Sequence, residues 1–194
     1  MRAPRPRLPN MSLEVAPDRT TIELRALAHP ARLRILSLLT GASMTAAEVA
    51  RELSLTHANA SYHLRQLHAA GAIMSAGEER IRGGIAKRYR YLPAADETPA
   101  SQPAESADRL VGRRAMYEAM TVELRRRARH EVHAGNRGHL TDAELWVDPE
   151  TWVDIRAKVH AASVTLHRVA KPPRTPGTIR VNATMALFEM EHDA

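Results

Sequence analysis

The chain has 194 residues, of which 44% are hydrophobic and only 4% aromatic, so a core of aliphatic side chains is expected. It has no cysteine, which excludes disulfides and thiolate metal sites and is typical of a cytoplasmic protein. No apolar run approaches the ~20 residues that cross a bilayer, and the first residues lack the apolar stretch of a secretory signal. The net charge of +6 is concentrated in the first half, which favours an anionic polymer as partner.

Composition divides the chain into four parts. The first is rich in Pro and Arg and predicts a disordered arm, in which either Met1 or Met11 is the true start. The second predicts short helices followed by a hairpin, and the third, rich in Pro, Ala, Ser and acids, predicts a flexible linker. The fourth predicts a long helix and a strand-helix-strand region, so the fold class expected is mainly α with small β elements. The four parts are residues 1–17, 18–92, 93–107 and 108–194.

Residues 18–41 predict two helices. Asp18 can cap the first of them. His29 precedes Pro30, and a residue before proline avoids helical geometry, so we expect a break there with His29 holding the turn. Pro30 suits the first turn of the second helix, which is predicted to end near Gly41.

Two further helices are predicted on either side of a tight turn at residues 54–55. Thr45 and Glu48 have the spacing of a capping box that opens the first, and Thr56 can cap the second, which runs to about Ala70. Such a pair can place its second helix in the major groove of DNA. The apolar positions of this second helix repeat at i, i+4 and i+7, which leaves a polar face for DNA, although Tyr62 is as well explained as a plain surface residue. The candidate DNA contacts on it are Thr56, His57, Asn59, Ser61, Tyr62, His63 and Arg65.

Two extended runs, Ile73–Glu79 and Ala86–Leu92, predict a hairpin. The segment between them, Arg80–Ile85, contains two glycines, which are typical of a turn. The hairpin is rich in Lys and Arg, and these cations can contact the phosphate backbone beside the minor groove. The candidate backbone contacts are Arg82, Lys87 and Arg88.

Four stretches of this region occur in the order and spacing of a known family. Residues 27–36 (LAHPARLRIL), 47–53 (AEVAREL), 61–67 (SYHLRQL) and 70–73 (AGAI) together resemble winged helix-turn-helix regulators of the arsenic-repressor (ArsR) type. The resemblance covers residues 20–92. It implies a homodimer that binds double-stranded DNA, with repression as the expected effect and the helix from Thr56 as its recognition helix.

Many ArsR-type relatives sense metals, but the residues of their metal sites are not matched here. The stretch that resembles their Cys-pair site is Ser43–Val49, which has no thiol. His130 and His133 have the spacing of half of a second site, but the other half falls on Tyr117 and Ala119, which are not zinc or nickel ligands. We therefore expect no metal and no cofactor, and a solvated pair of histidines.

A long helix is predicted from Asp108 to about His133. Its apolar residues repeat every seven, so it needs a partner. In proteins of the ArsR type the helix after the wing pairs with its twin, and this role is expected here, although packing on its own chain is also consistent with the stripe. The candidate dimerisation residues are Leu110, Tyr117, Met120 and Leu124.

The last part of the chain predicts two strands and a helix between them. Leu140–Val147 and Thr178–Met190 alternate as strands do and are expected to pair in a small sheet. Asp148 can cap the helix, which runs to about Ala170 and is expected to cover that sheet. This region can hold a small ligand, lock a dimer or bind a protein. Three of its aromatic residues either line a pocket or fill a core, namely Trp146, Trp152 and Phe188.

The sequence therefore favours a sequence-specific DNA-binding transcription regulator that works as a homodimeric repressor. Two alternatives remain open: a winged-helix protein-interaction module that has lost DNA contact, and a regulator with a small-molecule effector in the C-terminal region. An enzyme is not expected, because the chain lacks a phosphate-binding glycine loop, a nucleophile elbow and an HExxH motif.

Overall fold

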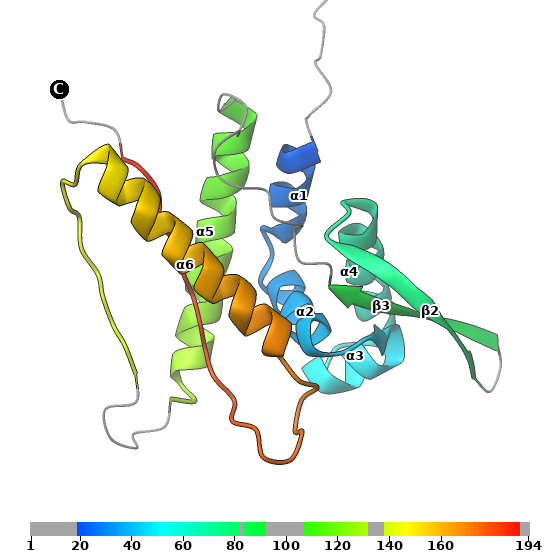
Figure 1. Cartoon of the computed structure of the whole chain (residues 1–194). Coiled ribbons are helices and arrows are strands. Elements are labelled where there is room, and N and C mark those ends of the chain that lie inside the picture. The colour runs from blue at the N-terminus through cyan, green and yellow to red at the C-terminus, as the bar shows by residue number, and fades with distance from the viewer. Residues whose placement is uncertain (1–18, 82–83, 92–106, 132–137, 191–194) are drawn as a thin grey trace, which may run out of the picture.

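The computed structural model describes residues 19–81, 84–91, 107–131 and 138–190. Within these residues lie six helices and one three-stranded antiparallel sheet, so the mixed fold class with an N-terminal winged helix-turn-helix is confirmed (Figure 1). The predicted arm 1–17, all but the last residue of the predicted linker 93–107, and His133 lie outside the described residues. In chain order the elements are α1 (Arg19–Leu27), α2 (Pro30–Gly41), β1 (Met44–Thr45), α3 (Ala46–Leu53), α4 (His57–Ala69), β2 (Ile73–Ile81), β3 (Gly84–Tyr91), α5 (Ala107–Ala128) and α6 (Pro149–Val169).

The helix ends of the first half follow local side-chain chemistry. His29 caps α2, because its Nδ1 accepts a hydrogen bond from the backbone N–H of Ala31 at 3.1 Å. Thr45 and Glu48 form the predicted capping box at the start of α3. Ser54 ends α3 in the left-handed region with φ 54°, and the chain then turns directly into α4.

The sheet has the strand order β1-β3-β2, in which the hairpin β2–β3 is the wing. Both strands of the wing run closer to its tip than the sequence predicts, because Arg80, Ile81, Gly84 and Ile85 are paired strand residues rather than loop. The register shifts between Ser75 and Glu78, where Gly77 takes a φ of 113° that favours glycine. The two-residue strand β1, which pairs with Tyr89 and Arg88, had no sequence signal.

One hydrophobic core holds the winged domain together. It joins α2, α3, α4 and the start of β2, and the rings of Tyr89 and Tyr91 on β3 pack against it. Its fully buried large side chains are aliphatic, as the low aromatic content requires, and they are Ile35, Leu39, Val49, Leu64 and Leu67.

α5 packs against α1 and α2 through the face that the sequence did not single out. Its buried residues are Arg109, Gly112, Ala119 and Glu123. A Cβ on Gly112 would lie 3.2 Å from the Cβ of Leu24, so the glycine allows α1 and α5 to approach closely. The predicted dimerisation residues lie off this face: Leu124 is exposed, and Leu110, Tyr117 and Met120 are half-buried.

The two strands predicted in the last part of the chain do not form. Residues 138–148 and 170–190 contain no strand, although α6 between them matches its prediction, with Asp148 as its cap. Figure 1 shows residues 138–148 at the left edge, apart from residues 178–190, which run between α5 and α6. A strand needs a neighbouring backbone to donate and accept its hydrogen bonds, and within the part of the chain that the structure describes neither segment makes such bonds. Trp146 is 84% exposed, so it does not share a pocket or core with Trp152 and Phe188.

Candidate DNA interface

The helix α4 presents a polar face because its apolar side chains anchor it. Ala60, Leu64 and Leu67 are buried in the core. The Oγ1 of Thr56 accepts a hydrogen bond from the backbone N–H of Asn59 at 3.2 Å, which fixes the start of the helix. The first turn is exposed, so its unpaired backbone N–H groups are open to an anion such as a phosphate.

The outward face of α4 carries hydrogen-bonding and aromatic groups. Tyr62 is 50% exposed, and Asn59 and Arg65 are exposed beside it. His57 is exposed at the edge of this face, and Ser61 is half-buried. Gln66 is also exposed on the outward face, where sequence reasoning did not place a contact. Gln66 is four residues after Tyr62, and residues at this spacing share a helix face, so the sequence could have predicted its position.

His63 points into the molecule. Its ring centroid lies 4.8 Å from that of His29, and its buried Nδ1 has no hydrogen-bond partner among the described residues. Burial lowers the pKa of His63, and the nearby His29, Arg32 and Arg34 lower it further. The pKa of His29 is lowered in the same way, first by burial and then by Arg32 and Arg34. This geometry gives His63 an internal packing role.

The wing presents two of its cations on the side of α4. Tyr89 lies on this side, since its ring meets that of His68 at 5.7 Å. Lys87 is two residues from Tyr89 and so points to the same side of the sheet. Arg80 pairs with Ile85, which is two residues from Lys87, so Arg80 points to this side too. Both cations are exposed. Arg80 lies in strand β2 and not in the loop that the sequence predicts.

Arg88 points to the opposite side of the wing and is used inside the molecule. Its Nη2 lies 3.2 Å from the carboxylate of Glu48, its Nε donates to the Oγ of Ser43 at 3.4 Å, and its Nη1 pairs with Glu79. Arg90, two residues on, shares this side and is exposed. Arg82 lies outside the described residues. Arg88 therefore fastens the wing to the start of α3.

The ion pair of Arg88 reaches the capping box itself. Burial alone would raise the pKa of Glu48, but hydrogen bonds from Thr45 and the charges of Arg88 and Arg51 outweigh it, so the pKa lies below its ordinary value. Glu48 accepts a hydrogen bond from the backbone N–H of Thr45 at 2.8 Å while it faces Arg88. One carboxylate thus orders both the wing and the helix before α4.

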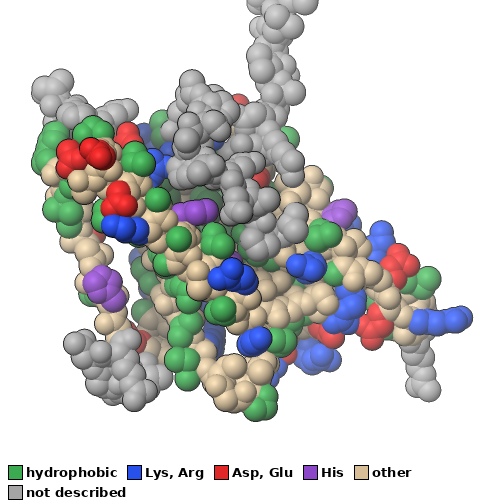
Figure 2. Space-filling model, viewed as in Figure 1, with side chains coloured by type: hydrophobic (Ala, Val, Ile, Leu, Met, Phe, Trp, Pro, Cys, Tyr) green, Lys and Arg blue, Asp and Glu red, His purple; other side chains and the backbone are tan. Residues whose placement is uncertain are grey.

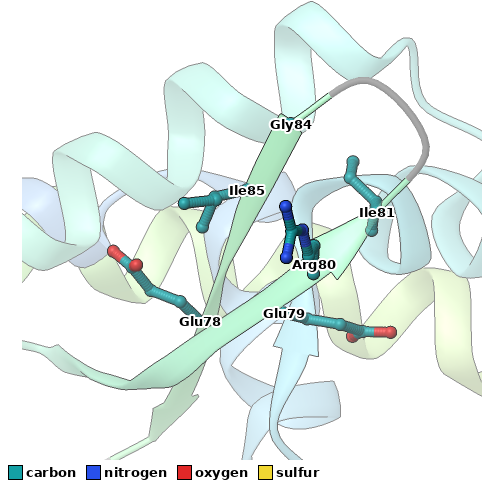
Figure 3. Close-up of a pocket in the computed structure, with 6 residues that line it drawn as sticks. All are labelled: Glu78, Glu79, Arg80, Ile81, Gly84 and Ile85. Carbon is teal, nitrogen blue, oxygen red and sulfur yellow. The ribbon is translucent and has the colours of Figure 1, made fainter.

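The tip of the wing is an open surface. A hollow of about 560 Å³ is lined by side chains from both strands, and Figure 3 shows Arg80 between Ile81 and Ile85 near the loop. Its two acidic residues are Glu78 and Glu79. Figure 2 shows the same mixture along the wing, where Lys and Arg side chains alternate with acidic ones. The charge of the wing is therefore mixed, and the face beside α4 carries Arg80 and Lys87 together with Glu78, which lies opposite Lys87 on the neighbouring strand.

The described residues contain no group of three or more His, Cys, Asp or Glu side chains placed to hold a metal ion. No helix among them is long and apolar enough to cross a membrane.

Comparison with known proteins agrees with this geometry. A family model described as a helix-turn-helix domain matches residues 27–76, about a quarter of the chain, from the end of α1 through α4 into β2. No curated protein matches the chain. With the hairpin that follows α4, the chain contains a helix-turn-helix domain of the winged type, the fold of DNA-binding regulators.

Proposed function

We propose that the chain is a sequence-specific DNA-binding transcription regulator of the ArsR type that works in the cytoplasm as a homodimer. α4 enters the major groove, and the wing contacts the neighbouring phosphate backbone. One observation carries the proposal: the exposed cations Arg80 and Lys87 lie on the side of the wing that meets α4, and α4 itself exposes Tyr62 and Arg65.

The ten candidate contacts divide by their geometry. Tyr62, Asn59 and Arg65 are proposed to meet base edges, while Thr56 and His57, at the start of α4, are proposed to meet phosphate. Lys87 and Arg82 are proposed as phosphate contacts of the wing, and Arg80 joins them. Three candidates are half-buried, and for them we propose supporting roles at the interface: Ser61, His63 and Arg88.

The test compares two cations of the same strand. Purified protein is used to capture genomic fragments, and fluorescence anisotropy then measures the affinity for the best fragment over a range of salt. Lys87→Ala should weaken binding several-fold and reduce the slope of log affinity against log salt by about 0.9, the value for one lost phosphate contact. Arg90→Ala, the matched control on the other side of the wing, should leave the slope unchanged.

Base reading is tested separately. Arg65→Ala should weaken binding to the captured site more than binding to a scrambled site, because a base contact is worth about 1–3 kcal/mol of discrimination. Equal losses on both sites would assign Arg65 to phosphate. Failure of the unmodified protein to bind any fragment at low salt would overturn the proposal and leave the winged domain as a protein-interaction module.

The direction of regulation and the signal are tested in a reporter strain. Repression is proposed on the resemblance to ArsR-type regulators, so transcription from a promoter that carries the captured site should fall when the protein is made. A small-molecule effector in the C-terminal region would lower the affinity for DNA when added. The captured site should be a pseudo-palindrome, because a two-fold symmetric protein places two recognition helices about 34 Å apart.

A further inference from the structure

The C-terminal region exposes a large amount of apolar side chain. α6 has 21 residues, and none of them is buried. Before and after it the chain is extended, with Leu140 95% exposed and Ile179 85% exposed. Figure 2 shows hydrophobic side chains next to acidic ones over the start of α6. Contiguous apolar surface of this kind is a site of association, because its contact with water is unfavourable.

Residues 178–190, which we call the inner segment, lie against α5 and have the sequence alternation of a strand. The even-numbered side faces α5: Asn182 accepts a hydrogen bond from Arg127 at 3.2 Å, and the ring of Phe188 stacks on a ring of α5 at 5.1 Å. The odd-numbered side is apolar and carries Ile179 and the 64% exposed Val181. The inner segment is thus held against α5, and residues 179–190 make no backbone hydrogen bond to another segment of the described residues, so a second strand can pair with it.

Residues 138–148, which we call the outer segment, have the complementary character. Leu145 and Val147 share one side with Ala143 and are exposed, and Figure 1 shows the segment at the left edge of the molecule. No backbone hydrogen bond joins the outer segment to the inner segment or to the sheet of the described residues. Both segments therefore have the sequence alternation of strands, but no backbone hydrogen bond among the described residues pairs them.

We infer that a second copy of the chain completes these strands: the outer segment of each copy pairs with the inner segment of the other. The exchange is reciprocal, as two-fold symmetry requires, and it would cover the exposed side chains on both copies. The inference rests on the proposed homodimer and adds the residues that close it. The two segments have eleven and thirteen residues. Together these are within the roughly 20–30 residues that each partner gives to a stable interface.

Charge favours the pairing of an outer segment with an inner segment over the pairing of two outer segments. Residues 138–154 contain five acidic residues and no Lys or Arg. The inner segment contains Arg180 and lies beside the end of α5, where Arg125 and Arg129 are exposed and form no ion pair with the described residues. An outer segment that met its own copy would bring Asp142 and Glu144 close to the same carboxylates, which is unfavourable. The inner segment carries one arginine, Arg180, and one acid, Glu189, which already lies 4.0 Å from Arg156 of α6. Against the inner segment, Asp142 and Glu144 therefore meet Arg180 and the neighbouring arginines of α5.

The test uses the absence of cysteine from the chain. Single cysteines are placed by Ala143→Cys in the outer segment of one variant and by Ala183→Cys in the inner segment of a second variant that carries a larger tag. The two are mixed, unfolded, refolded together and oxidised, and the products are separated by size. A few neighbouring pairs, such as Leu145→Cys with Met185→Cys, cover other registers. Ala58→Cys on the exposed face of α4 replaces Ala143→Cys as the matched control.

The expected result is a mass in light scattering of twice the 21.5 kDa of one chain, with a disulfide between the two variants and none with the control. A chain that stays monomeric would overturn both this inference and the proposed homodimer, while DNA binding is judged by its own assay. A dimer in which no pair cross-links between copies would overturn the strand exchange alone. So would an Ala143→Cys/Ala183→Cys variant that forms its disulfide only within one chain.

Discussion

α4 and α6 are both amphipathic helices of one chain, but they differ in what covers them. α4 has 13 residues and buries Ala60, Leu64 and Leu67, each no more than 1% exposed. α6 is longer, with 21 residues, and buries none. The winged domain therefore completes its own core, whereas the C-terminal region offers apolar surface that its own chain leaves uncovered. The contrast separates a helix whose apolar side is covered by the winged domain from one that has no buried residue.

The largest effect should come from the core of the winged domain. Leu64→Ala removes a fully buried side chain and should lower the free energy of unfolding by about 3 kcal/mol, measured by urea denaturation. The matched change Leu166→Ala on the uncovered α6 should cost less than about 1 kcal/mol at low protein concentration. Equal costs at low concentration would contradict the contrast between the two helices.

The next effect concerns the attachment of α5 to the winged domain. Glu123 is 3% exposed, and Arg126 donates to its carboxylate at 2.8 Å while the Nε of Arg34 on α2 lies 3.7 Å away. Glu123→Ala leaves these guanidinium groups without their acceptor and should cost about 2 kcal/mol, below the usual range for a buried pair because the arginines are partly exposed. Glu118→Ala on the exposed side of α5 is the control and should change the free energy of unfolding by less than about 0.5 kcal/mol.

A smaller effect should come from the point where the C-terminal region crosses α2. A Cβ at Gly41 would lie 2.2 Å from the backbone oxygen of Lys171, so the segment after α6 must move. Gly41→Ala should cost about 1 kcal/mol and increase proteolysis after residue 170, since the segment is lifted from α2. Gly138→Ala, where a Cβ meets nothing, should leave proteolysis unchanged. Unchanged cleavage in Gly41→Ala would show that this contact does not hold the segment.

The smallest effect is a dependence of stability on pH. The pKa values of His29 and His63 lie below the ordinary 6.5 in the folded chain, so the unfolded chain binds more protons as the pH falls through 6.5. Their contribution to stability is complete above that pH and is lost as the solution becomes more acidic. His63→Gln should flatten the slope of unfolding free energy against pH between 7 and 5. An unchanged slope would mean that this pair does not titrate as the structure implies.

The elements of the winged domain could be predicted because their signals are local. Pro30, the Thr45–Glu48 pair and Thr56 each set a helix start through groups no more than three residues away. His63 lies three residues after Ala60 and four before Leu67, so helical spacing already favoured the core side for it. Its contact with His29 could not be predicted, because His29 is 34 residues earlier and comes close only in the folded chain.

The wing and the C-terminal region show the limits of sequence reasoning. Arg80 was placed in a loop because the register of the wing depends on the bulge at Gly77, which no local pattern reveals. The alternation in residues 140–147 and 178–190 predicted two paired strands, and this was wrong, because neither segment forms a strand. Alternation does not identify the neighbouring strand, since pairing is decided by distant parts of the chain or by another chain.

The ion pairs of Arg88 have a mechanical consequence. They bind the wing to the start of α3, while Arg25 with Asp108 and Arg34 with Glu123 bind α1 and α2 to α5. In the proposed homodimer, the winged domain and α5 of each copy would therefore move together. A small rotation at the proposed contact between the copies would then change the distance between the two copies of α4. A signal at that contact would thus alter DNA binding without deforming either winged domain.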